Sequence, residues 1–279
     1  MRPLATFFLL LFASAAAAQS APTLSAPEAQ SLVARALATE SRAAQNFGHD
    51  RPMRYRLRKS SPRITTTKEI VETRDGDVAR LIAISDQPLS VAAEQQETAR
   101  LDALLADPSL QQHRKQSEEN DTGRALKVLR VLPTAFVYEF AGMGAASNGG
   151  TVARFTFRPN PEFNPPDLET GVLTAMAGEL WVDPSAARVV RLAGSLLEDK
   201  QIGWGLLGEL DKGGWVEINQ ADVGAGEWRI VHLMLKMNGR LLWKQKNSDS
   251  VQDYSQFAPV AAGIDYRQAI RLLRGETGR

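Results

Sequence analysis

A strict alternation of apolar and polar side chains begins just after residue 50 of this chain. Residues 51–61 place Met53, Tyr55 and Leu57 on one face and a row of arginines on the other. This spacing predicts a strand with one buried face. Residues 63–85 predict two further strands joined at Asp75-Gly76, a frequent hairpin turn.

The second half of the chain reads mainly as strands. Asn238-Gly239 predicts a tight turn between two of them. The segment from Gly178 to Gly194 reads as a hairpin whose turn begins at Asp183-Pro184. The predicted strands are residues 134–141, 151–158, 178–183, 187–198, 215–221, 227–237, 240–246 and a segment near 251–257.

Helical spacing occurs in three main places, and residues 167–176 are the candidate for one further short helix. Residues 25–45 carry an apolar stripe behind a capping box at Ser25 and Glu28. Residues 90–132 form a helical insertion, in which the polar segment 111–124 is expected to be an exposed, mobile helix end or loop. An amphipathic helix at 264–275 closes the chain. Helical blocks serving about ten antiparallel strands predict an α+β layer architecture rather than βαβ repeats.

The first residues have the three parts of a secretory signal: Arg2, an apolar run and Ala16-Ala17-Ala18. Cleavage after Ala18 would separate a signal peptide, residues 1–18, from a single domain, residues 19–279. The mature part would hold 32 basic and 32 acidic side chains, because the signal contains one of the 33 Lys and Arg residues. This balance argues against nucleic acid as a partner.

The 279 residues include no cysteine. The fold must therefore form without disulfides, and no cysteine is available for a lipid anchor. We expect a periplasmic protein that does not span the membrane once the signal is removed.

Motifs for catalysis are weak or missing. Residues 203–208 match G-x-G-x-x-G, but a strand-like segment follows where a nucleotide site needs a helix. His49, His113 and His232 are spaced too widely for a zinc motif, and no G-x-S-x-G occurs. We therefore expect no cofactor, no metal site, no catalytic residues and no enzymatic activity.

Apolar strand faces are the most informative feature. A sheet with an aromatic and Met-rich face needs cover, and the pattern leaves open whether helices alone cover it or an apolar cavity remains. The candidate ligand-binding residues of such a cavity are Tyr55, Phe136, Tyr138, Phe155, Phe157, Leu180, Trp204, Leu206, Leu235 and Trp243.

The order of elements, and the W-V-D-P and A-R-V-V-R-L-A-G segments within residues 181–194, resemble the superfamily of periplasmic lipoprotein carriers. The outer-membrane lipoprotein receptor and a regulator of envelope-stress signalling belong to the same superfamily. The resemblance spans about residues 50–260 and implies a curved, unclosed antiparallel half-barrel with helices over its concave face. It also implies an arginine in an early strand that holds the helices closed, for which Arg54, Arg56 and Arg58 are the candidates.

Together these features predict a non-enzymatic periplasmic protein that binds a lipid or an acylated partner, with a possible place in lipid or lipoprotein trafficking. The alternative is an envelope scaffold or stress sensor that binds another protein and no lipid. An exported hydrolase is the third hypothesis, and it lacks the motifs that would favour it.

Overall fold

The computed structural model describes residues 24–45, 51–146, 149–202, 208–241 and 244–276. The helices are α1 (Ala26–Gln45), α2 (Val91–Ala106), α3 (Pro108–Ala135) and α4 (Tyr266–Leu273), with a 3-10 helix η1 (Thr170–Ala175). The strands are β1 (Met53–Ser60), β2 (Thr65–Val71), β3 (Val78–Ile84), β4 (Gln87–Pro88), β5 (Phe136–Ala145), β6 (Thr151–Pro159), β7 (Met176–Asp183), β8 (Arg188–Leu196), β9 (Lys200–Ile202), β10 (Gly208–Leu210), β11 (Trp215–Asp222), β12 (Trp228–Leu241) and β13 (Lys244–Pro259).

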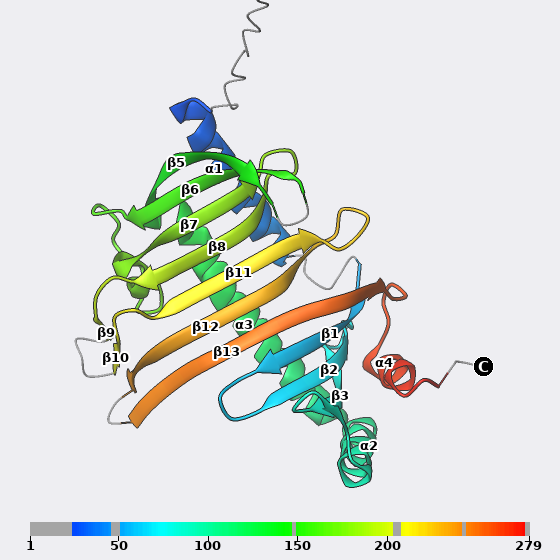
Figure 1. The fold of residues 1–279 in the computed structure, drawn as a ribbon. Coiled ribbons are helices and arrows are strands. Elements are labelled where there is room, and N and C mark those ends of the chain that lie inside the picture. The colour runs from blue at the N-terminus through cyan, green and yellow to red at the C-terminus, as the bar shows by residue number, and fades with distance from the viewer. Residues whose placement is uncertain (1–23, 46–50, 147–148, 203–207, 242–243, 277–279) are drawn as a thin grey trace, which may run out of the picture.

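All the strands belong to one 13-stranded sheet with the main order β4-β3-β2-β1-β13-β12-β11-β8-β7-β6-β5. The paired strands are antiparallel, from the β1–β2 hairpin to the β5–β6 hairpin at the far edge. The edge strands β4 and β5 do not pair with each other, so the sheet stays unclosed (Figure 1). The predicted fold class, an α+β half-barrel, is confirmed.

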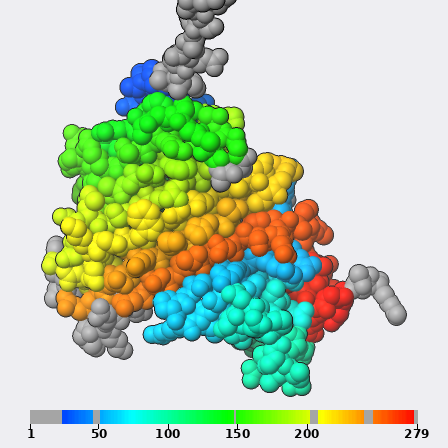
Figure 2. Space-filling model, in the orientation of Figure 1, coloured from blue at the N-terminus to red at the C-terminus, as the bar shows by residue number. Residues whose placement is uncertain are grey.

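Helices α1 and α3 lie along one face of the sheet, behind the strands in Figure 1. This is the concave face, as predicted. Figure 2 shows the opposite face, where strands form most of the surface and the helices α2 and α4 appear only at its lower edge. On that face Trp181 lies near two guanidinium groups, 4.4 Å from that of Arg154 and 5.4 Å from that of Arg191. Cation-π contacts therefore cover the apolar ring of Trp181, which no helix covers.

Apolar side chains pack in separate clusters. The largest joins α1 and the end of α3 to β5–β8, and includes Leu37, Phe155 and Leu180. A second cluster packs α2 and α4 on β2 and β3 around Val71 and Val78. A third surrounds Tyr55 on β1. The amphipathic stripe of α1 faces the first cluster, which is why this helix lies flat on the sheet.

Residues 111–124 are not a loop or a helix end: they lie inside α3, which is one helix of 28 residues. The prediction failed because the segment is polar on nearly every side. Its docking contacts are also polar, since the buried Gln111 side chain donates to the carbonyl oxygens of Asp75 and Gly76, both at 3.0 Å. The helix also continues past Pro133 to Ala135.

Asn238-Gly239 is not a turn either, because β12 continues through both residues to Leu241. Gly239 instead pairs with Leu210 of β10. A Cβ atom at Gly239 would collide with the carbonyl oxygen of Glu209. The glycine thus permits a close approach of two strands, a role that its sequence neighbourhood does not reveal.

Gly178 makes a similar close approach inside the predicted hairpin, which forms as β7 and β8. It is paired with Gly194, and a Cβ atom there would collide with the carbonyl oxygen of Ala193. We expect Gly178→Ala to lower the free energy of unfolding by about 2–3 kcal/mol, because backbone must move. Urea denaturation measures this. Gly171→Ala is the control, since a Cβ atom there meets no neighbour within 4 Å; equal effects of the two substitutions would contradict the prediction.

Candidate functional site

A cavity of about 700 Å³ lies between the concave face of the sheet and the two helices that cover it. Its walls come from α1, α3, β7, β8, β11 and β12, together with Arg51 and the segment before β12. The lining residues are Leu37, Glu40, Ala43, Ala44, Arg51, Ala125, Val128, Leu129, Leu132, Leu180, Arg188, Val189, Leu192, Ile218, Gln220, Gly226, Glu227, Trp228, Arg229 and Ile230.

The apolar wall follows from strand pairing. Leu180 pairs with Leu192, and Leu192 pairs with Ile218, so these three side chains form one row across β7, β8 and β11. Leu129 of α3 and Ala44 of α1 face this row across the cavity. Ile230 is 37% exposed and lines the same space, so the cavity is open to solvent.

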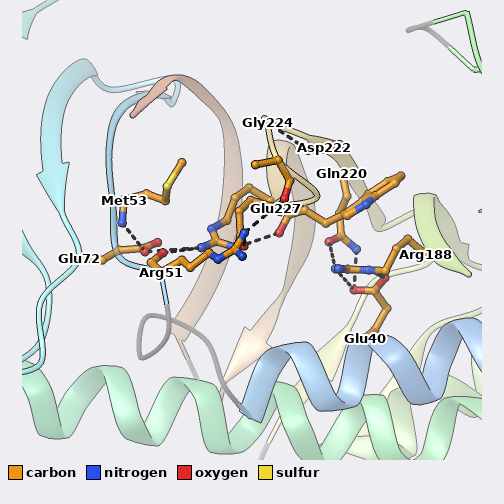
Figure 3. A network of polar contacts seen from close by, with 12 residues as sticks. Glu40, Arg51, Met53, Glu72, Arg188, Gln220, Asp222, Gly224 and Glu227 are labelled. Carbon is orange, nitrogen blue, oxygen red and sulfur yellow. Dashed lines mark hydrogen bonds and ion pairs between the residues drawn. The ribbon is translucent and has the colours of Figure 1, made fainter. Parts of the chain in front are cut away.

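A set of hydrogen bonds around the Glu40 carboxylate, at the edge of the cavity, links α1 to the sheet. The Glu40 carboxylate accepts hydrogen bonds from Arg188 Nε at 2.8 Å and Nη2 at 3.0 Å. It also accepts from Gln220 Nε2 at 3.1 Å and from the backbone N–H of Val189 at 2.9 Å. The side chains of Glu40 and Arg188 are only 9% and 12% exposed. Four donors thus satisfy a buried carboxylate (Figure 3).

A second set of polar contacts lies beside the first (Figure 3). Glu227 Oε1 is 2.9 Å from Arg51 Nη1, and its Oε2 is 3.1 Å from Arg229 Nη1. Arg229 Nη2 donates to the carbonyl oxygen of Arg51 at 3.1 Å and lies 3.9 Å from Glu72. Burial raises the pKa of Glu72, whose carboxylate also accepts from the backbone N–H of Met53 at 2.9 Å.

The structure distributes the predicted site residues over several places. Leu180 lines the cavity. Phe136 and Tyr138 border a separate hollow of about 340 Å³ between α1, the end of α3 and β5. Phe155 and Phe157 lie in the largest apolar cluster, where both are almost fully buried. Their rings contact aromatic side chains of β5, Phe140 beside Phe155 and Phe136 beside Phe157, so they belong to the packed core rather than to the cavity wall.

The remaining predicted residues lie elsewhere. Tyr55 is buried in the cluster around β1, with its ring 5.4 Å from that of Phe257. Leu235 is half-buried in β12 and does not border the cavity. Trp204, Leu206 and Trp243 lie outside the described residues.

The three candidate arginines of the first strand do not hold the helices. Arg54 and Arg56 pair with Glu69, and Arg58 pairs with Asp86 at 2.7 Å, all within neighbouring strands and turns. Arg188 in β8 fastens α1 to the sheet. Arg80 in β3, which the sequence analysis did not single out, pairs with Glu94 of α2 and donates to the carbonyl oxygen of Leu273 in α4. The expectation for the first strand was wrong because its polar face carries its own carboxylate partners.

The sequence analysis missed the charged residues that line the cavity, and the buried pair of Glu40 and Arg188 shows why. The two members of the pair are 148 positions apart, so no local spacing connects them. One signal was available: Glu40 continues the stripe of Val33, Ala36 and Leu37 at helical spacing, which places a carboxylate on a buried face. A buried carboxylate is costly unless it is paired, so this position predicts a buried cationic or hydrogen-bonding partner.

Among the described residues, the histidines and carboxylates form no metal site, and His49 lies outside them. His232 is paired with Asp253 at 2.7 Å on neighbouring strands, and His113 is exposed. Across the part of the chain that is described, no group of three potential ligands could hold a metal ion. Within the same residues, no helix is long and apolar enough to cross a membrane.

Comparison with known proteins identifies no family for this chain. No family model matches the chain, and no curated protein matches it. The solved structures include a domain from Vibrio parahaemolyticus that is provisionally described as an outer membrane lipoprotein-sorting protein. It aligns with a TM-score of 0.30 and 11% identity, over 87% of this chain and 99% of that one.

Proposed function

We propose that this protein binds the acyl chain of a lipid or of an acylated partner in the cavity between α1, α3 and the sheet. The observation that carries the proposal is the apolar wall formed by Leu180, Leu192 and Ile218 opposite helix side chains. Pockets of roughly 300–1,000 Å³ with apolar walls and a few polar groups are typical of small-molecule sites. The cavity has this size and composition.

The proposal is for a binding protein rather than an enzyme, acting in the periplasm after removal of residues 1–18. That segment lies outside the described residues, so the proposal of export depends on the sequence pattern. A packed interior would have favoured the alternative, a scaffold that binds only protein. The cavity favours a lipid ligand.

Delipidated protein should take up a fluorescent fatty acid saturably, and Ala44→Trp should weaken that uptake at least about tenfold because the indole fills apolar space that the chain would occupy. Ala44 lines the cavity, whereas Ala38 is exposed on the same helix. Ala38→Trp is therefore the matched control and should leave the affinity unchanged. Fluorescence titration of the three proteins measures both effects.

Two results would contradict the proposal. The first is an absence of saturable uptake by the unmodified protein. The second is an equal loss of affinity in Ala38→Trp and Ala44→Trp, since binding would then not depend on the cavity.

A further inference from the structure

The two groups of polar side chains at the cavity differ in the ratio of guanidinium groups to carboxylates. The Glu40 carboxylate is satisfied by four donors and forms a neutral pair with Arg188. The other group sets two guanidinium groups, of Arg51 and Arg229, around the single carboxylate of Glu227. The residues that line the cavity include three arginines and two glutamates, and two of the arginines share the single lining carboxylate of Glu227.

Glu227 occupies the position that an anionic ligand group would take. A carboxylate or phosphate held between two guanidinium groups receives charge-assisted hydrogen bonds from both. The Arg51 side chain is 60% exposed and that of Glu227 is 21% exposed, so rotation of the glutamate side chain would give solvent access to this place. Glu72 lies 3.9 Å from Arg229 on the side away from the cavity, whose lining does not include it, so it leaves the place between Arg51 and Arg229 to Glu227.

The apolar wall lies beside this group, because Trp228 and Ile230 line the same cavity as Glu227 and Arg229. We infer that the ligand is a small amphiphile with an anionic headgroup, a carboxylate or a phosphate, which displaces Glu227 between Arg51 and Arg229 while its acyl chain fills the cavity. This inference rests on the proposed function and adds the class of headgroup.

The test compares ligands with one chain and different headgroups. Dodecanoate, dodecyl phosphate, dodecanol and dodecyltrimethylammonium are titrated into the delipidated protein by calorimetry, each below its micelle concentration. We expect both anions to bind about tenfold more tightly than dodecanol, the range of one or two charge-assisted hydrogen bonds. The cation should bind more weakly than dodecanol. The difference between the two anions tells whether a carboxylate or a phosphate fits better.

Two variants separate headgroup recognition from chain binding. Arg51→Met should lower the affinity for the anions to near that for dodecanol, and it should change the affinity for dodecanol far less. Glu227→Gln should raise the affinity for the anions a few-fold, because it removes the internal competitor, about the effect of one charged contact. Arg58→Met is the control, since Arg58 pairs with Asp86 away from the cavity, and it should change nothing.

The outcomes distinguish the two proposals. Equal affinity for dodecanol and the anions, or an equal loss for all four ligands in Arg51→Met, would overturn the headgroup inference and leave chain binding in place. Failure of all four ligands to bind would overturn the proposed function as well.

Discussion

Replacing Glu40 with alanine is expected to lower the free energy of unfolding by about 3–5 kcal/mol, because it leaves a buried guanidinium group without its partner. Arg188 is 12% exposed and would lose two hydrogen bonds, and the backbone N–H of Val189 would lose its acceptor. Urea denaturation followed by circular dichroism measures the change.

Two further variants test the cause. Glu139→Ala removes an ion pair with Arg158 whose side chains are 62% and 56% exposed, and should cost less than about 1 kcal/mol. The double substitution Glu40→Leu with Arg188→Met should recover most of the lost stability, because an apolar pair needs no hydrogen-bond partner. If Glu40→Ala cost no more than Glu139→Ala, the pair would not fasten α1.

The second large effect is on the pH dependence of stability, through Asp77 at the turn between β2 and β3. Burial raises the pKa of this carboxyl to about 8, with further contributions from Glu118 on α3 and from Glu72. The Tyr55 hydroxyl lies 3.5 Å from the Asp77 carboxyl, and Arg114 of α3 opposes the shift. The backbone N–H of Asp77 donates to Glu118 at 2.9 Å, so the turn and α3 are joined at this point.

The folded protein keeps the Asp77 proton between pH 4 and pH 8, whereas the unfolded chain loses it near the ordinary pKa of 3.8. The free energy of unfolding should therefore fall as pH rises through this window, by at most about 1.4 kcal/mol per pH unit, and become level above it. Partial exposure reduces the effect, so we expect a total loss of the order of 2 kcal/mol from this residue. Glu118 and Glu72, whose pKa values burial also raises, act in the same direction.

Asp77→Asn should remove most of this pH dependence and make the protein more stable than the unmodified form at pH 9. Denaturation in urea at pH 5, 7 and 9 gives the comparison. Glu162→Gln is the control, because Glu162 is exposed in the segment after β6, and this substitution should leave the pH dependence unchanged. A slope that survives in Asp77→Asn would assign it to another group.

Local patterns predicted much of this fold. The hairpin of β7 and β8 forms with its turn where Asp183 Oδ1 accepts from the backbone N–H groups of Ser185 and Ala186, at 2.8 Å and 3.0 Å. Leu180 and Val182 face the buried side, as their alternation predicts. Such features depend on neighbours along the chain, which is why a single sequence reveals them.

The site depended on contacts that the sequence does not show. Whether Phe155 meets a helix or a ligand depends on how far α1 and α3 stand from each strand, and that distance is set by side chains far away in the chain. Glu40 and Arg188 meet only after both helix and hairpin have formed. Polar helices such as α3 are missed for a related reason, since Gln111 is buried by backbone carbonyl groups rather than by an apolar stripe.

The separation of the apolar clusters has a mechanical consequence. The large cluster under β5–β8 and the cluster of α2 and α4 on β2 and β3 have no buried residue in common, and Ile218, Trp228 and Ile230 of the cavity belong to neither. Closely packed interiors resist deformation, whereas a twisted sheet bends with small changes at each strand pair. Val216 of β11 and Met237 of β12 pack on the large cluster, whereas Ile218 and Ile230 lie nearer the other ends of these strands. Bending at those ends would widen or narrow the cavity while both packed regions stay intact, and the proposed acyl-chain site would then adapt to chains of unequal length.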